Sequence, residues 1–163
     1  MDKINIYGVK PNIGVTHLAA MLVGFLNKME YTAAYVGEDK GGAAEFKVPI
    51  LDVPADELSE KEDYDYIVID RGTRLQSAAP DDVNIIVTGI KPNERAAEMK
   101  IRPFSAAKNA IFVNNFAPEG MIDGKLSIPW KDRPVLPEEY PDFFGLLMTA
   151  YLEKKEELAE EET

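Results

Sequence analysis

The sequence of 163 residues contains no cysteine, and its single histidine is His17. The absence of cysteine excludes disulfide bonds, metal sites built from thiolates and a cysteine nucleophile. A single histidine excludes a metal site of several histidines and argues against a Ser-His-Asp triad. Any site chemistry therefore rests on hydroxyl, carboxylate, amide and cationic side chains.

Positive charge is scarce: the chain has 18 Lys and Arg residues but 29 Asp and Glu residues, which gives a formal net charge of −11. Such an acidic surface argues against direct binding of nucleic acid or of anionic lipid. No apolar run approaches the roughly 20 residues of a membrane span, and the first residues show no signal-peptide pattern. We therefore expect a cytoplasmic protein with protein partners and no strong membrane signal.

Hydrophobic residues make up 45% of the chain, which is typical of a globular domain. Short apolar runs predict strands over 3–8, 33–36, 66–69, 83–88, 110–113 and 126–128. Apolar residues at helical spacing predict helices over 16–29 and 94–102, and a last helix after 137–141. We expect Thr16 to cap the first helix, Gly41 and Gly42 to form a flexible turn, and 46–53 to hold a short extended piece.

The alternation of strands and helices is typical of an α/β fold. The run 66–69 is apolar throughout, which is the pattern of a parallel strand buried on both faces. We expect a mostly parallel, twisted sheet with helices on both faces. The chain would form a single domain over residues 1–152, followed by an acidic helix extension or tail over residues 153–163.

The segment 9–15, which joins the first strand to the first helix, is the leading candidate for a ligand site. In an open α/β sheet, ligands bind beyond the carboxyl ends of the strands. The free N–H groups at a helix N-terminus favour binding of an anion, and phosphate is the ligand we expect there. The P-loop pattern G-x-x-x-x-G-K-[ST] is met at Gly14 and Thr16, whereas Val9 replaces its first glycine and Val15 its lysine.

The loop resembles the deviant Walker A motif, K-G-G-x-G-K-[ST], of the MinD/ParA family of P-loop ATPases, whose early signature lysine is matched by Lys10. Further landmarks follow in the family's order. They are the acidic residue Asp39, the strand 65–70 ending in Asp70, the strand 81–87, the strand 111–114 ending in Asn114, and the Ile-Pro turn at 127–132. The resemblance covers residues 3–135 and implies a P-loop NTPase-like fold.

The resemblance also implies roles for single residues. Thr16 and Asp70 would hold Mg²⁺, Asp39 would orient the attacking water, and Asn114 would pair with adenine. Lys10 would reach the phosphates of the partner in a nucleotide-sandwich homodimer. The implied ATP/ADP-binding residues are Lys10, Asn12, Ile13, Gly14, Val15, Thr16, His17, Asn114 and Pro129, and the implied catalytic residues are Asp39 and Lys10.

Three differences from the family pattern should weaken ATP binding and hydrolysis. Val15 removes a charge-assisted bond to phosphate, worth about 1.5–3 kcal/mol, and Pro11 lacks a backbone N–H. The segment 71–82 is shorter than the family's switch region. We therefore expect a degenerate, regulatory protein that positions or controls a cellular assembly of the division, partitioning or pilus type. It would be a slow Mg²⁺-dependent ATP hydrolase, a nucleotide binder with little turnover, or a nucleotide-free interaction scaffold that retains the fold.

Four other residues have two interpretations each. His17 would either contact phosphate or pack locally. Arg71 and Arg74 would either replace the missing lysine charge or form surface ion pairs. Trp130 would either stack on adenine or pack against the protein.

Overall fold

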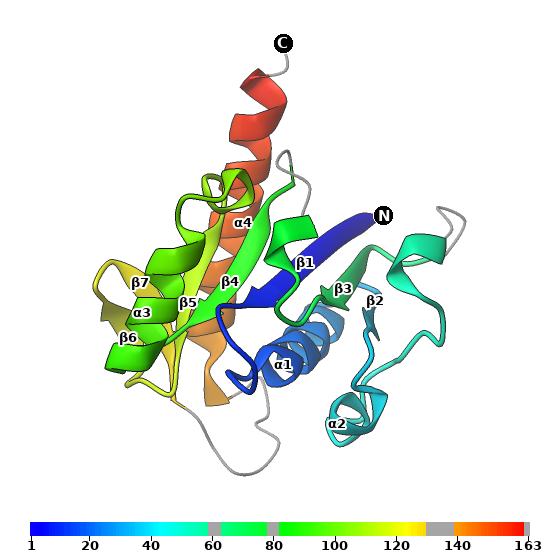
Figure 1. Cartoon of the computed structure of the whole chain (residues 1–163). Coiled ribbons are helices and arrows are strands. Elements are labelled where there is room, and N and C mark those ends of the chain that lie inside the picture. Colours follow the sequence, from blue (N-terminus) through cyan, green and yellow to red (C-terminus); the bar gives the residue numbers. More distant parts are fainter. Residues whose placement is uncertain (59–62, 78–81, 130–138, 162–163) are drawn as a thin grey trace.

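The computed structural model describes residues 1–58, 63–77, 82–129 and 139–161, and it combines a sheet with helices that lie between several of its strands in the chain (Figure 1). The strands are β1 (Asp2–Gly8), β2 (Ala33–Val36), β3 (Tyr66–Asp70), β4 (Asn84–Thr88), β5 (Ile111–Asn115), β6 (Gly120–Ile122) and β7 (Lys125–Ile128). The helices are α1 (Val15–Lys28), α2 (Lys40–Ala44), α3 (Pro92–Ile101) and α4 (Pro141–Glu161). Single 3₁₀ turns lie at Ala55–Glu57, Leu75–Ser77 and Ser105–Ala107.

These strands form one twisted sheet in the order β2-β3-β1-β4-β5-β7-β6. All neighbouring pairs are parallel except β6–β7, which is an antiparallel hairpin at the edge. The predicted α/β class, with a mostly parallel sheet, is confirmed. The hairpin strand β6 was not predicted.

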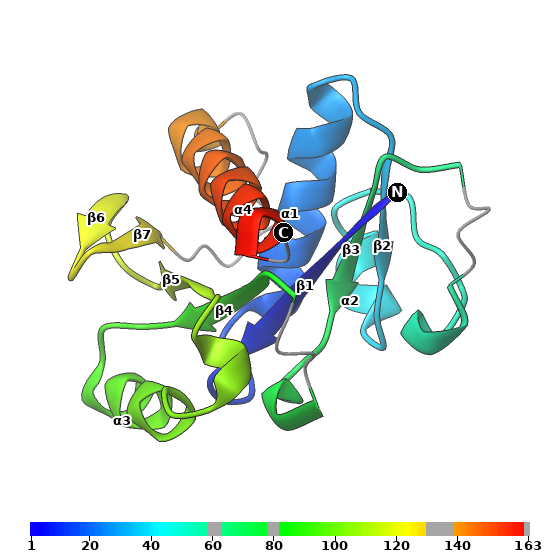
Figure 2. The ribbon, with the colours of Figure 1, turned by 90° about the horizontal axis from the view of Figure 1, so that it is seen from above.

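Helices cover both faces of the sheet, as predicted. Figure 2 shows α1 and α4 side by side on one face and α3 on the other. The rings of Phe25 in α1 and Phe144 in α4 stack with centroids 5.5 Å apart. The main core lies on this face, between the two helices and alternate strand residues such as Ile4, Val68 and Ile85.

The opposite face is covered by shorter segments. Tyr7, Ile86 and Phe112 pack there with the 3₁₀ turns, and Ile67 and Ile69 pack against the connection that follows α2. Successive strand residues point to opposite faces, so both sets are buried although they alternate in sequence. This explains why the central strands are apolar throughout.

Two local predictions are wrong. The first turn of α1 is not capped by Thr16, because Gly14 occupies the N-cap position and the Thr16 hydroxyl bonds elsewhere. Gly41 and Gly42 do not form a flexible turn but lie inside α2, where the Asp39 carboxylate accepts a hydrogen bond from the Gly42 N–H and caps the helix.

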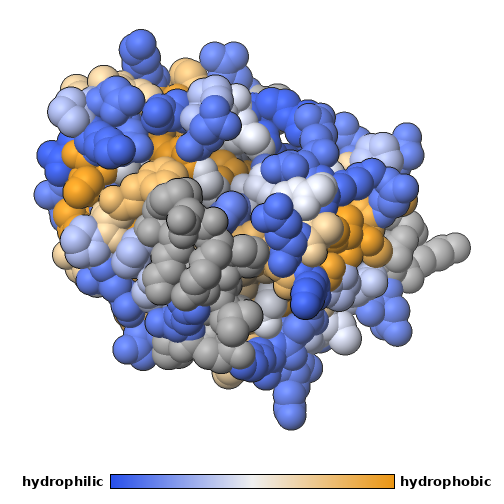
Figure 3. Space-filling view, turned by 90° about the horizontal axis from the view of Figure 1, so that it is seen from below, coloured by the Kyte–Doolittle hydropathy of each residue, from blue (hydrophilic) through white to orange (hydrophobic). Residues whose placement is uncertain are grey.

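The predicted extended piece at 46–53 is present only as a single parallel bridge between Ile50 and Tyr35. Helix α4 continues to Glu161 without a break at residue 152, and Leu158 packs against the main core. Its far end carries mostly glutamate. Seen from below, the surface is mainly hydrophilic, with apolar residues in separate patches (Figure 3).

Candidate functional site

The loop between β1 and α1 lies at the carboxyl edge of the sheet, where the strand order changes direction. β1 sits between β3 and β4, so the chain leaves β1 toward β2 on one side and later crosses to β4 on the other. Ligands in open α/β sheets bind at such a switch point, because the connections diverge there and leave a crevice. The sequence prediction that this loop occupies the ligand-binding edge is therefore consistent with the fold.

The loop backbone turns through two left-handed residues, Asn12 (φ 60°) and Gly14 (φ 94°). Left-handed residues within a loop turn successive N–H groups toward one side, which produces a concavity that suits an anion. The first N–H groups of α1 have no partner within the helix and open toward the same region. Pro11 contributes no N–H, so the cradle has one donor fewer than a loop without proline.

Asn115, at the end of β5, fixes this loop from the side of the core. Its amide nitrogen donates to the carbonyl oxygen of Ile13 at 2.9 Å, and the side chain is buried. In a trans peptide the C=O and the following N–H point in opposite directions. The bond from Asn115 therefore directs the N–H of Gly14 away from the core. Asn115 was not predicted as a site residue from the sequence, where the adjacent Asn114 was the candidate.

Beside the loop, a carboxylate receives three hydrogen bonds. The Thr16 hydroxyl donates to Oδ2 of Asp70 at 2.6 Å, and the Tyr35 hydroxyl donates to the same oxygen at 2.8 Å. The N–H of Gly72 donates to Oδ1 at 3.1 Å. Burial, together with the charge of Asp70, raises the pKa of Tyr35 far above its usual value, so its hydroxyl stays protonated.

Most of the predicted site residues line one pocket of about 320 Å³, which is at the small end of the range for ligand sites. Nine of them lie around it: Lys10, Asn12, Ile13, Gly14, Val15, Thr16, His17, Asp39 and Asp70. Pro11, Gly72, Thr73 and Phe116 complete the lining. The structure thus brings together residues from the loop, from α1 and from the ends of β2 and β3.

The charge of this pocket is slightly negative. Lys10 is the only cationic side chain among the described residues that line it, against the carboxylates of Asp39 and Asp70. Burial lowers the pKa of His17 below its usual value, which favours the neutral ring. That ring lies edge-to-face against Phe46 with centroids 5.0 Å apart, so local packing accounts for its position.

Thr16 and Asp70 fit a magnesium ion in their chemistry. The Thr16 hydroxyl uses its proton in the hydrogen bond to Asp70. The lone pairs of the Thr16 oxygen therefore remain available to bind a cation. Mg²⁺ prefers oxygen ligands and typically takes only one or two from the protein, with water and phosphate oxygens completing the set. Among the described residues there is no group of three His, Cys, Asp or Glu side chains suited to a metal. Phosphate oxygens of a bound nucleotide would supply further ligands for a cation held by Thr16 and Asp70.

Val15 does not project into open space. Its side chain is 9% exposed and belongs to the main core. A Cβ atom added to Gly8 would come within 2.8 Å of Val15 and 2.7 Å of Ile13, so both side chains pack tightly against the end of β1. The position that carries a phosphate-binding lysine in the P-loop pattern is occupied here by core packing.

Asn114 and Pro129 are not among the residues that line this pocket. Asn114 is 1% exposed, and its amide nitrogen donates to the Ile122 carbonyl and to the Ser127 hydroxyl. Its side chain is thus directed into the sheet edge near the β6–β7 hairpin, and the predicted pairing with adenine does not fit this arrangement. Trp130 and the predicted turn beyond it lie outside the described residues.

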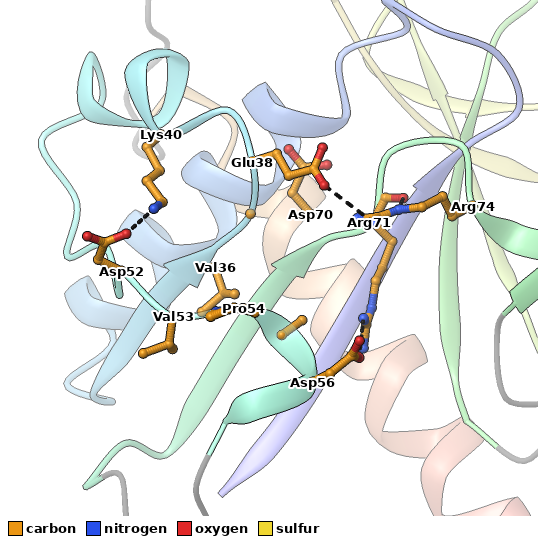
Figure 4. A pocket seen from close by; sticks show the side chains of 12 residues that line it. Val36, Glu38, Lys40, Asp52, Val53, Pro54, Asp56, Asp70, Arg71 and Arg74 are labelled. Atoms are coloured by element: carbon orange, nitrogen blue, oxygen red, sulfur yellow. Dashed lines mark hydrogen bonds and ion pairs between the residues drawn. The ribbon is translucent and has the colours of Figure 1, made fainter.

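Arg71 and Arg74 face a second pocket of about 540 Å³, at the carboxyl ends of β2 and β3 (Figure 4). Arg71 donates to the Asn5 side chain at 2.9 Å and lies 3.8 Å from Asp56, and Arg74 lies 3.5 Å from Glu38. Neither arginine lines the loop pocket. The interpretation as ion pairs fits better than the replacement of the missing lysine.

No protein-family model matches the chain, and a comparison with curated proteins gives no match. Within the described residues, no helix combines the length and the apolar character that a membrane span requires. Support for a function therefore comes from the geometry of the loop pocket.

Proposed function

We propose that this chain binds ATP or ADP together with Mg²⁺ in the loop pocket, as a degenerate P-loop protein of the MinD/ParA type. In that role it positions or regulates a cellular assembly through protein partners. The observation that carries the proposal is the 2.6 Å hydrogen bond between Thr16 and Asp70. It places a hydroxyl and a carboxylate beside the N-terminus of α1, at the switch point of a parallel sheet.

Electrostatics support a magnesium complex rather than a free nucleotide. The described side chains that line the pocket carry one positive and two negative charges, since His17 favours its neutral form. A phosphate chain alone would meet net repulsion from Asp39 and Asp70. A bound Mg²⁺ would neutralise part of the phosphate charge and reverse the sign of the local field. Lys10 and the N–H groups of the loop would then bind the remaining phosphate oxygens.

Turnover is expected to be slow or absent. Val15 supplies no charge to stabilise the transition state, a loss that weakens catalysis more than binding. Asp39 lines the pocket and is exposed, but one of its carboxylate oxygens already accepts the Gly42 N–H at 3.0 Å. Asp39 can therefore orient a water through its other oxygen. Lys10 would contribute to catalysis only across a homodimer.

Titration calorimetry with ATP and with ADP, each with and without Mg²⁺, tests the proposal. We expect millimolar or tighter binding with Mg²⁺, and binding that is weaker by at least tenfold but still measurable without it. In Thr16→Ala the affinity should fall at least tenfold, because a hydrogen bond to a charged group is worth about 1.5–3 kcal/mol. Thr149→Ala is the matched control, since its hydroxyl donates within α4, to the Gly145 carbonyl at 2.9 Å, and Thr149 does not line the pocket.

The second candidate is a nucleotide-free interaction scaffold that retains the fold. The packing of Val15 and Ile13 against Gly8 favours it, because a loop held by core contacts needs no ligand to keep its shape. This candidate predicts no heat with either nucleotide at millimolar concentrations, and no difference between wild type and Thr16→Ala in any ligand titration.

A further inference from the structure

Tyr35 is a fully buried residue of β2 whose hydroxyl reaches the neighbouring strand. It is 0% exposed, and its oxygen donates to Oδ2 of Asp70 at 2.8 Å. A phenolic hydroxyl has one proton to donate, and Tyr35 gives it to the residue that we assign to the magnesium end of the pocket. Tyr35 itself does not line that pocket.

The hydrogen bonds divide the two oxygens of Asp70 into different roles. Oδ2 accepts both hydroxyl donors, Thr16 at 2.6 Å and Tyr35 at 2.8 Å, which uses its two lone-pair directions. Of these three donors, Oδ1 accepts the N–H of Gly72 alone. One lone-pair direction of Oδ1 therefore remains for a further hydrogen-bond donor. The carboxylate is thus held from three segments of the chain, and its orientation is set before any ligand arrives.

Gly37 packs against the Tyr35–Asp70 pair from the side of α2. A Cβ atom at Gly37 would lie 2.5 Å from the Tyr35 hydroxyl oxygen and 2.8 Å from Cβ of Asp70. The backbone at the end of β2 therefore lies directly on the pair and leaves no room for another side chain. The Tyr35 hydroxyl also lies 3.5 Å from the carbonyl oxygen of Asp39, at the start of α2.

We propose that Tyr35 is a positioning residue for magnesium binding, which rests on the proposed function. Tyr35 occupies the second acceptor direction of Oδ2, so Asp70 cannot rotate away from Thr16. The Thr16 proton then stays directed at Asp70 and its lone pairs stay directed at the pocket. Partners of this kind, which hold a metal ligand without touching the metal, typically change metal affinity 10–100-fold when they are removed.

The test uses the full chain with Tyr35→Phe, which removes one hydroxyl and keeps the ring. The apparent Mg²⁺ affinity is measured by titration in the presence of saturating ADP, and ADP affinity is measured without Mg²⁺. We expect Mg²⁺ affinity to fall at least tenfold while ADP affinity without Mg²⁺ stays within twofold. Tyr151→Phe is the matched control, because Tyr151 is a 2% exposed tyrosine of α4 that does not line the pocket.

A second variant acts on the same pair without removing the hydroxyl. In Gly37→Ala the added methyl group would clash with both Tyr35 and Asp70 and displace them. We expect a similar loss of Mg²⁺ affinity. Gly41→Ala is its control, because a Cβ atom at Gly41 would meet nothing within 4 Å. Thermal unfolding without ligand identifies variants that fail to fold, and the Mg²⁺ comparison is made on those that fold.

The outcomes separate this inference from the proposed function. Wild-type protein that binds no magnesium nucleotide overturns the proposed function and the role of Tyr35 with it. Wild-type binding with unchanged Mg²⁺ affinity in Tyr35→Phe overturns the role of Tyr35 alone. An equal loss of ADP affinity with and without Mg²⁺ also overturns it, because that pattern indicates a general structural role.

Discussion

The side-chain amide of Asn115 donates a 2.9 Å hydrogen bond to the carbonyl oxygen of Ile13, 102 positions earlier in the chain. The bond joins the end of β5 to the loop before α1 and is buried. It thereby ties the candidate site to the sheet independently of any ligand. The stability of the loop and its shape should consequently change together when this contact is altered.

Asn115→Leu should destabilise the protein by about 1–3 kcal/mol, because the Ile13 carbonyl would be left buried without a donor. Urea unfolding measures the loss, and hydrogen exchange should become faster at the Leu18 amide, which donates to the Gly14 carbonyl at 3.0 Å. Asn93→Leu, an exposed change in the first turn of α3, is the control and should leave both quantities unchanged. Equal stability of wild type and Asn115→Leu would show that the bond does not hold the loop.

Gly14→Ala should be more damaging than an ordinary glycine substitution. Its φ of +94° is unfavourable for a residue with a Cβ, and that Cβ would lie 2.2 Å from the Asn115 amide nitrogen. Strain and clash together predict a loss of at least about 2 kcal/mol. Gly41→Ala in α2 should instead stabilise by about 0.5–1 kcal/mol, since alanine favours a helix. Thermal or urea unfolding of both variants checks the opposite signs.

Val15→Lys tests whether the site retains a phosphate cradle. A lysine here restores a charge-assisted bond, so the affinity for magnesium ATP should rise at least tenfold in calorimetry. The same change places a charge where a core side chain lies, so stability should fall. Val15→Met, of similar length, should lose some stability without gaining affinity. Unchanged affinity in Val15→Lys would show that the pocket is closed to phosphate.

Glu98→Gln should make stability depend less on pH. Burial opposes ionisation of Glu98, but hydrogen bonds from Lys125 and Arg102 outweigh it and hold its pKa below the usual 4.5. A depressed pKa in the folded state stabilises the protein above pH 4.5, and this contribution is lost as the pH falls through the folded value. Replacement should therefore cost about 1.5–3 kcal/mol at pH 7.

The difference between wild type and Glu98→Gln should shrink as the pH is lowered below 4.5, in urea unfolding at several pH values. Glu153→Gln, an exposed change on α4, controls for the removal of one negative charge. A difference that stays constant with pH would mean that the pairs with Lys125 and Arg102 do not set the ionisation of Glu98.

The sequence predicted the parallel sheet well, because buried parallel strands are apolar without interruption and are easily located. The resemblance to the deviant Walker A loop implied that Thr16 and Asp70 share one site, and the two side chains are joined by a hydrogen bond. The apolar runs were sufficient for the sheet, whereas the pair at the site was inferred from the family resemblance.

The face of β5 was harder to predict. Asn114 and Asn115 are adjacent in sequence, and a shift of one residue in a strand moves a side chain to the opposite face. The sequence offers no signal to choose between them, because Thr88 and Ser127, beside Asn114 in the sheet, become its neighbours only after folding. Tyr35 was missed for a related reason, since its hydroxyl finds Asp70 only after β2 has paired with β3.

Two local errors had signals that were available. The β6–β7 hairpin turns at Asp123 and Gly124, which both have positive φ, and Asp-Gly is a strong hairpin signal. The helix α2 contains two glycines, but Asp39 stands before it with the spacing of an N-cap. The prediction of a turn followed from the two glycines and gave no weight to Asp39, although an N-cap residue stabilises the first turn of a helix.

The central position of β1 has a consequence for biosynthesis. β1 leaves the ribosome before both strands that flank it. Asn5 pairs with Ile69 and with Asn84, so one edge of β1 stays open until β3 has been translated and the other until β4 has been translated. Parallel sheets fold slowly, because long segments must close before their contacts form. Ile4 and Ile6, which are buried in the folded sheet, therefore cannot complete their packing before β4 is available, and an apolar stretch of this kind is a target for chaperones.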